Sequence, residues 1–484
     1  MQLNWLRITN RQIENTSWRW GTVTILAVLA VGLGFSFAHE SYLAVIILVS
    51  LPFLGIIFYR PEIGLWALFV VVFMFDWLAI ELHLLPQQAT WLSEILIVGI
   101  FFGVLSRKLV RRQRFLTTPL DLPILFLILN ILVSALLNAL SLPTLLVGVR
   151  SYLKYILLFY AVVNLPLSLK WEKLFIWVLI IATFLQVPVS ILQRILTGQR
   201  DKAGGTIGFN ATQDLTILII IVICILLSLI IYRQISPRWS FALFVLFVPP
   251  VFGEARAFFF LLPIALLVLF LQNPANIFRS LLLLLFLASV YWIAVRSYPT
   301  QTALVPYLEN PLLLLKLEES YAKGGELARV GAFNFANQMV WGTKGGGFLG
   351  AGPGSASPSF FSLASGELYQ AYQRLRPFRI VYSKLVLELG YLGLVILSAI
   401  FFRMFVSAIS CIRNAADRFW QAFGFAYVEV LLLFALSVFY INWVDSDVLM
   451  FVFWILTAVV IRVSKLSPKT GIKVYREARE NRKI

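Results

Sequence analysis

The chain has 484 residues, of which 60% are hydrophobic and only 13% are charged, and its formal net charge is +17. Soluble domains carry about 25% charged residues, so this composition excludes an ordinary soluble domain. Repeated apolar runs reach the roughly 17–25 residues that a membrane-spanning helix needs. Basic residues of such proteins gather in cytoplasmic loops, so the positive charge does not favour nucleic-acid binding.

We predict an all-α polytopic membrane protein with about 14 transmembrane helices and one large extracytoplasmic loop. The predicted spans are residues 21–37, 41–59, 63–80, 92–106, 121–139, 145–164, 172–195, 213–232, 238–252, 255–271, 280–296, 381–411, 418–441 and 446–463. Pro249, Pro250 and Gly253 interrupt the region 238–271, which is either a broken helix pair or a re-entrant turn. No cleavable signal peptide is expected, because the first 20 residues are polar and basic.

This pattern divides the chain into four parts: residues 1–296 with helices 1–11, the loop subdomain 297–380, residues 381–463 with helices 12–14, and a basic tail, 464–484. The positive-inside rule predicts that both termini are cytoplasmic. The cluster between Arg107 and Arg114 and the tail then face inward, whereas the short outer loops 81–91, 139–144 and 442–446 contain no Lys or Arg.

Several cations lie on the predicted outer side, where topology does not require them. They are Arg194, Arg200, Lys202 and Arg256 and, in the long loop, Lys316, Lys323, Arg329, Lys344, Arg374, Arg376 and Arg379. Long loops cross the membrane whatever their charge, but this leaves Arg194, Arg200 and Arg256 unexplained. An outward-facing anion-binding surface would account for them. Arg256 lies between two apolar runs, so either it pairs with Glu254 at the interface or it has a function.

The long loop contains a glycine-rich stretch, 342–359, and a helical pattern before it. The stretch lacks the Lys-Ser/Thr of a nucleotide-binding loop, so it is either a flexible turn over the bundle or a backbone cradle for phosphate. Glycine also permits a close approach of backbone to a partner. Phe333, Val340 and Trp341 recur at helical spacing and predict an amphipathic helix over 326–341 that lies on the membrane surface. Arg329 in its first turn either pairs with Glu326 or binds phosphate.

Other polar residues have two interpretations each. Arg150 and Lys154 are one turn apart and form a cationic face inside the bundle, or Lys154 approaches the cytoplasmic end. Asp214 is a helix cap or a catalytic residue. The two histidines, His39 and His83, do not make a metal site, and the cysteines do not indicate a disulfide.

The order of four features resembles the O-antigen ligase and Wzy-type polysaccharide polymerase superfamily. They are Arg256 beside a span, Arg329-x-x-x-Phe333 in a large outer loop, the segment Gly350-Ala-Gly-Pro-Gly-Ser355, and Glu388-Leu-Gly-Tyr-Leu-Gly393 at the start of a span. The resemblance implies a GT-C-like glycosyltransferase of the bacterial inner membrane that needs no cofactor and no metal. Its partners would be an undecaprenyl-diphosphate-linked oligosaccharide, an acceptor glycan or lipid, and bilayer lipids, without nucleic acid.

Family ligases usually carry a histidine about nine residues before the glutamate of the Glu-x-Gly segment, and Arg379 stands at that position here. This difference favours a polymerase or a divergent exopolysaccharide enzyme. The expected diphosphate ligands are Arg256, Arg329, Arg379 and Arg200, the candidate bases are Glu388 and Glu367, and the loop residues are Gly350, Gly352, Pro353 and Gly354. The alternatives are a transporter of a small anion such as bicarbonate and a flippase-like carrier. The cation-bearing loop and the absence of repeated halves speak against the transporter.

Overall fold

A computed structural model describes residues 55–199, 202–208, 210–253, 255–272, 325–358 and 365–465, with only the backbone at 87, 88, 256, 259 and 270–272. These residues form helices and connecting turns, with no strand among them. The long helices are α3 (Pro61–Asp76), α4 (Leu92–Val110), α5 (Asp121–Leu137), α6 (Leu142–Asn164), α7 (Leu169–Thr197), α8 (Thr212–Ile231), α9 (Trp239–Phe252), α10 (Arg256–Gln272), α17 (Val381–Asn414), α18 (Arg418–Ser437) and α19 (Asp447–Lys465).

Eight of the described helices are long and apolar enough to cross a membrane, and α5, α9 and part of α10 are shorter apolar helices. The protein is therefore embedded in a membrane, as the composition predicts. Eleven predicted spans correspond to described helices. The spans 21–37 and 280–296 and most of 41–59 lie outside the described residues, so the total of 14 stays a prediction. The region 238–271 is two helices that meet at Gly253, with both prolines inside α9.

Local sequence explains where several helices begin and end. Ser141 and Ser168 precede α6 and α7, and their hydroxyls accept hydrogen bonds from the backbone N–H of Thr144 and Trp171. Helix α7 ends at Gly198, which adopts the left-handed conformation with φ 65°. Helix α8 is apolar on all sides, and 94% of its apolar window is buried inside the protein. It therefore forms the centre of one half of the bundle, between α9, α10 and α18.

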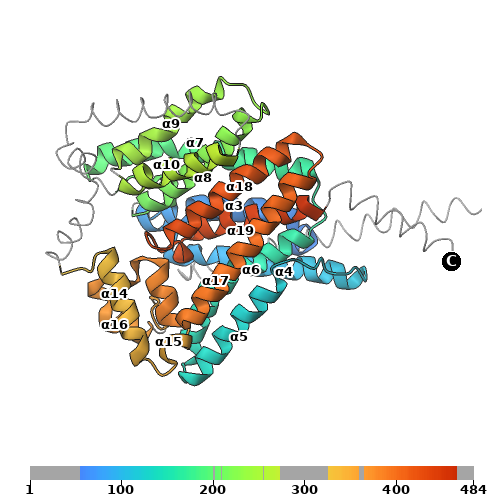
Figure 1. Cartoon of the computed structure of the whole chain (residues 1–484). Coiled ribbons are helices and arrows are strands. Elements are labelled where there is room, and N and C mark those ends of the chain that lie inside the picture. Colours follow the sequence, from blue (N-terminus) through green and yellow to red (C-terminus); the bar gives the residue numbers. More distant parts are fainter. Residues whose placement is uncertain are drawn as a thin grey trace, which may run out of the picture.

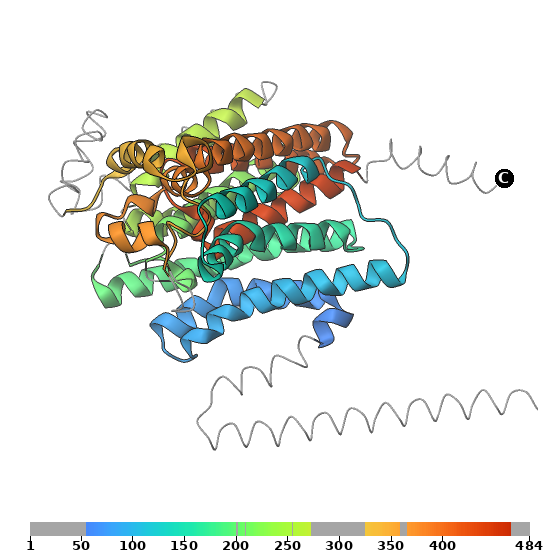
Figure 2. The same ribbon diagram turned by 90° about the horizontal axis from the view of Figure 1, so that it is seen from below.

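The bundle has two chemically different ends (Figure 1). The basic end comprises the C-terminal ends of α4, α6, α17 and α19 and the N-terminal ends of α5, α7 and α18. The loop end holds the opposite ends of these helices and the segment 325–380. Figure 2 shows the helices side by side, with this segment gathered at one end of the bundle. The charge pattern predicts that the basic end faces the cytoplasm.

A buried ion pair holds the basic end together. Nε of Arg462 in α19 lies 2.5 Å from Oε1 of Glu172 in α7, and both side chains are almost completely buried. The same guanidinium donates to carbonyl groups at the end of α6 and just after it, including Val162 and Leu167. A cation at this position is stabilised by the partial negative charge of the helix C-terminus. Arg462 therefore joins three helices in one contact.

The described part of the loop, residues 325–358 and 365–380, packs against the bundle. It contains the short helices α14 (Arg329–Met339), α15 (Gly346–Leu349) and α16 (Glu367–Tyr372). Helix α14 begins at Arg329 rather than at the predicted 326, and it packs on α17 through buried Ala332 and Ala336. Val340 is buried within the protein, whereas Trp341 is 60% exposed, and the predicted position of this helix on the membrane surface stays a prediction. The first part of the predicted loop, residues 297–324, lies outside the described residues.

Candidate functional site

Helix α17 is broken one third of the way along its length. Gly390 has φ 68° and ψ −172°, a conformation that occurs almost only in glycine, within otherwise helical backbone. The break removes the intrahelical partners of carbonyl groups in the preceding turn. These carbonyl groups are buried, so other donors have to satisfy them. The glycine-rich segment and helix α5 supply those donors.

The glycine-rich segment fills the break. The backbone N–H of Ala351 donates to the carbonyl of Leu387 at 2.7 Å, and that of Gly352 donates to the carbonyl of Glu388 at 2.9 Å. Residues 352–357 are buried, so the predicted flexible turn over the bundle is wrong for this stretch. The predicted close approach of backbone is confirmed, since a Cβ on Gly354 would collide with the carbonyl of Thr144 in α6. The N–H groups of Ala351 and Gly352 are occupied, which argues against a phosphate cradle at these two residues.

A polar stripe on α5 completes the arrangement. Asn130 donates to the carbonyl of Leu389 at 3.1 Å, Ser134 donates to that of Leu349 at 2.6 Å, and Asn138 donates to that of Gly350 at 3.0 Å. These three residues are spaced by four, so they share one face of the helix. The spacing is visible in the sequence and was a missed signal. The two motifs that carry the family resemblance, 350–355 and 388–393, thus form one interlocked unit.

Glu388 anchors this unit. Its side chain has 0% exposure. Its Oε1 accepts hydrogen bonds from the backbone N–H of Ala356 at 3.0 Å and from Ser357 Oγ at 2.9 Å, and its Oε2 accepts one from Tyr152 OH at 2.8 Å. A base must reach the proton that it removes. In this arrangement both carboxylate oxygens are occupied, which favours an anchoring role over the predicted catalytic one.

A network of charged side chains extends from Glu388 toward the surface. Lys384, one turn earlier and 1% exposed, forms an ion pair with Asp445, whose side chain is 36% exposed. The carboxylate of Asp445 also accepts hydrogen bonds from Asn442 at 2.7 Å and from Ser151 at 3.4 Å. Asp445 is thus the carboxylate of this group that solvent can reach.

A second group of charges lies beside the first, between α4, α6 and α19. Lys154 Nζ lies 2.8 Å from Asp447 Oδ2 and 3.0 Å from Glu94 Oε1. Arg150 Nε lies 2.7 Å from the same oxygen of Glu94. Lys154 and Arg150 therefore form the predicted cationic face inside the bundle, and Lys154 belongs to the loop end. Charged residues inside a membrane protein are costly and are functional candidates.

Two of the predicted arginines lie at one corner of the loop end. Arg329 Nε donates to the carbonyl of Tyr440 at 2.9 Å, and its guanidinium lies 3.8 Å from the centroid of the Tyr440 ring. Arg379 pairs with Glu326 at 2.9 Å, a carboxylate that it shares with Arg376. The expected alternative, a pair between Arg329 and Glu326, is therefore wrong. Asn442 connects this corner to the charge network, because its amide donates to both Phe378 O and Asp445.

The other predicted residues have different positions. Arg256 begins α10 at the loop end, and its side chain is not described; Arg200 and Glu254 lie outside the described residues. Glu367 is exposed in the first turn of α16. Arg194 caps the end of its own helix by donating to the carbonyl of Gly198 at 2.9 Å, which explains one of the outer cations. Asp214 lies in the first turn of α8 and hydrogen-bonds Ser446.

Sequence reasoning missed four of the site residues, namely Lys384, Asp445, Asp447 and Glu94. Two of them, Asp445 and Asp447, directly precede or begin a span, and Glu94 lies in the first turn of another. Three carboxylates at the starts of two spans on the same predicted side of the membrane are a signal in the sequence. The described residues hold no group of three or more His, Cys, Asp or Glu side chains that could bind a metal ion.

The geometry thus defines a site at the loop end: a helix break filled by the glycine segment, a buried Lys384 and Glu388, a half-exposed Asp445, and an arginine corner. Comparison with known proteins adds no assignment to this picture. The sequence matches no protein-family model, and no curated protein is similar to it.

Proposed function

We propose that the protein is a membrane glycosyltransferase, a polymerase or a ligase. It transfers a glycan from undecaprenyl diphosphate to an acceptor sugar at the loop end, on the outer side of a bacterial inner membrane. The observation that carries this proposal is the position of Arg329. Its ring-facing guanidinium is fixed by Tyr440, and its terminal nitrogens make no hydrogen bond to any described residue. A fixed guanidinium with free donors is suited to bind a diphosphate oxygen.

The chemistry requires a stabilised leaving group and a route for one proton. The acceptor hydroxyl oxygen forms a bond to the anomeric carbon, the bond from that carbon to the diphosphate breaks, and the lipid diphosphate leaves with the electron pair. Arg329 stabilises the charge that develops on it, and the family resemblance assigns Arg256 to the same role. The hydroxyl proton goes to a carboxylate in reach. Asp445 is the first candidate, because solvent reaches its carboxylate, unlike that of Glu388, and exposed Glu367 is the second.

Arg379 has a supporting role in this proposal. Its pair with Glu326 occupies a guanidinium nitrogen and fixes the segment before Arg329. We therefore assign it to positioning and leave Arg329 and Arg256 as the diphosphate ligands. Arg200 stays a prediction. The small-anion transporter remains the alternative function, and no described contact favours it.

A reconstituted assay tests the proposal. The purified protein in lipid nanodiscs is given an undecaprenyl-diphosphate-linked oligosaccharide with an acceptor, and the products are measured by mass spectrometry. We expect transfer by the wild type and a loss of about 100-fold or more in the rate for Arg329→Lys. This variant keeps the positive charge but loses the planar guanidinium, which donates two parallel hydrogen bonds to one phosphate. Arg374→Lys is the matched control, because Arg374 is an exposed arginine of the same segment. Equal activity of the two variants would exclude the assigned role of Arg329.

A deletion strain separates the possible products. Loss of long surface chains with single repeats retained indicates a polymerase, and lipid-linked polymer that accumulates without attachment indicates a ligase. An unchanged surface glycan with altered carbon uptake would refute the transferase and support the anion transporter.

A further inference from the structure

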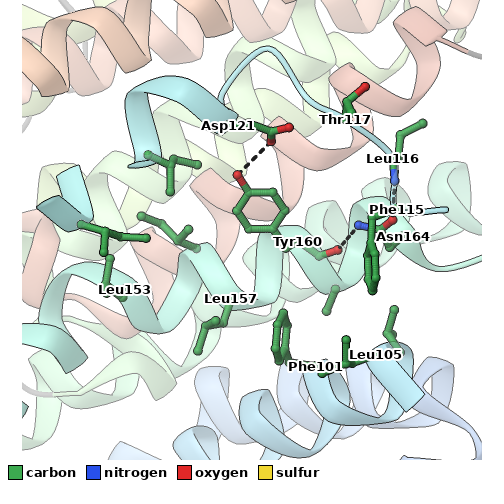
Figure 3. A pocket seen from close by; sticks show the side chains of 15 residues that line it. Phe101, Leu105, Phe115, Leu116, Thr117, Asp121, Leu153, Leu157, Tyr160 and Asn164 are labelled. Carbon is green, nitrogen blue, oxygen red and sulfur yellow. Dashed lines mark hydrogen bonds between the residues drawn. The ribbon is translucent and has the colours of Figure 1, made fainter. Parts of the chain in front are cut away.

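The membrane-embedded part has a second site at the opposite end of the bundle. A pocket of about 450 Å³ lies between α4, α5 and α6 and the connection before α5 (Figure 3). This volume lies within the usual range of ligand pockets. Its walls are mainly apolar side chains, including Phe101, Leu153 and Leu157. Such a pocket in this part of the molecule accepts a hydrocarbon chain.

Hydrogen bonds hold the pocket open at the basic end. Tyr160 OH donates to Asp121 at 2.9 Å, and the side chain of Asn164 accepts the backbone N–H of Leu116 at 2.8 Å (Figure 3). Asp121 also accepts the N–H of Thr118 at 2.9 Å. The polar groups at the mouth are therefore already paired with the protein. A ligand gains little from them, and its chain is recognised by apolar contact.

Cations surround the mouth of the pocket. Lys108 Nζ lies 5.5 Å from the centroid of the Phe115 ring and donates to the carbonyl of Arg114 at 2.9 Å. Lys465, at the end of α19, donates to the carbonyl of Thr117. The connection 111–120 adds the exposed Arg111, Arg112 and Arg114 and contains no acidic residue. Asp121 is the one carboxylate that lines this pocket, so the charge at the mouth is strongly positive.

We propose that this pocket binds one acyl chain of an anionic phospholipid from the adjacent leaflet, with the headgroup phosphate held by Lys108 and Lys465. Basic pockets between membrane helices on the cytoplasmic side are typical sites for anionic headgroups. The lipid links α19 to the α4–α5 connection, because Lys465 and Lys108 approach that connection from different helices. It would stabilise the basic end. The proposal does not rest on the proposed transferase activity.

Lipid titration tests the site on the delipidated full-length protein. Phosphatidylglycerol and phosphatidylcholine with identical chains are added, and binding is followed by native mass spectrometry and by the melting temperature. We expect phosphatidylglycerol alone to raise the melting temperature. The double variant Lys108→Gln/Lys465→Gln should bind it about thirtyfold more weakly, since each base near the surface contributes roughly fivefold. Equal effects of the two lipids, or an unchanged affinity in the variant, would overturn the proposal.

A substitution that fills the pocket tests the binding of the lipid's acyl chain separately from the binding of its headgroup. Leu157→Trp places a larger side chain in the pocket and should abolish the phosphatidylglycerol effect. Leu125→Trp is the control, because Leu125 is 50% exposed on α5 and does not line the pocket. If Leu157→Trp does not fold, wild-type protein is labelled with a phosphatidylglycerol that carries a photoreactive acyl chain. Cross-links within 101–117 or 153–164 support the site, and cross-links only elsewhere refute it. Stabilisation by glycerophosphoglycerol, which has no acyl chains, would indicate a simple anion site instead.

Discussion

Gly350 lies against the backbone of Gly390 at the point where α17 is broken. A Cβ on Gly350 would lie 2.8 Å from the backbone nitrogen of Gly390, and a Cβ on Gly390 would collide with the carbonyl of Phe348. Both glycines also have positive φ values, 67° and 68°. No larger residue fits at either position without moving the backbone.

Replacing either glycine should therefore destabilise the protein. We expect Gly350→Ala and Gly390→Ala to lower the free energy of unfolding by about 3 kcal/mol or more, from the combined steric and backbone strain. The measurement is the melting temperature and the folded yield in detergent. Gly342→Ala is the control, since a Cβ there meets no atom within 4 Å. Wild-type stability of Gly390→Ala would mean that the break in α17 is not as described.

Glu388→Gln distinguishes an anchor from a base. The substitution replaces one carboxylate oxygen by an NH2 group, which cannot accept a hydrogen bond from the buried donors around it. We therefore expect the free energy of unfolding to fall by about 1–3 kcal/mol. Tyr152→Phe removes one of the three bonds and should cost less. Both are measured by thermal unfolding alongside the transfer assay. A fully stable Glu388→Gln protein without activity would restore Glu388 as the catalytic base.

Lys154 should be the most costly cation of the loop end to remove. Lys154→Ala leaves Glu94 and Asp447 close together without this charge, and we expect a loss of about 3 kcal/mol or more. The double variant Lys154→Ala/Asp447→Asn should recover part of this loss, which denaturant unfolding can measure. The pair of Lys173 with Asp417 is the control, because its side chains are 33% and 46% exposed. Lys173→Ala should cost less than about 1 kcal/mol. Equal losses at the two pairs would contradict this account.

Cysteine labelling tests the orientation of the bundle. A labelling position has to be exposed, which excludes Ser357 of the loop segment, because it is buried and bonded to Glu388. The native Cys224 and Cys411 are buried, so background reaction should be low. We expect Glu367→Cys to react with an impermeant reagent in intact cells, and Arg112→Cys to react only after lysis. The reverse pattern would invert the topology and move the proposed site to the cytoplasmic side.

Hydropathy located the helices well but could not locate the site. The apolar runs predicted the eleven described helices that correspond to spans, since burial of apolar surface sets their length. The break at Gly390 was not predictable, because a single glycine in an apolar run is equally compatible with a continuous helix. Pairs such as Lys154 with Asp447 and Arg462 with Glu172 are separated by 293 and 290 residues in the chain. Only the three-dimensional arrangement identifies such partners.

The interlock at the helix break has a consequence for how the protein is made. The donors that satisfy the first part of α17 come from the segment before it and from α5, which is synthesised more than 200 residues earlier. Until these donors are in place, the carbonyls of Leu387, Glu388 and Leu389 would meet hydrocarbon, at several kcal/mol each. We therefore expect residues 345–357 and the start of α17 to assemble together against α5 and α6. The order of synthesis favours this assembly, because α5 and α6 are synthesised before residues 345–357 and α17.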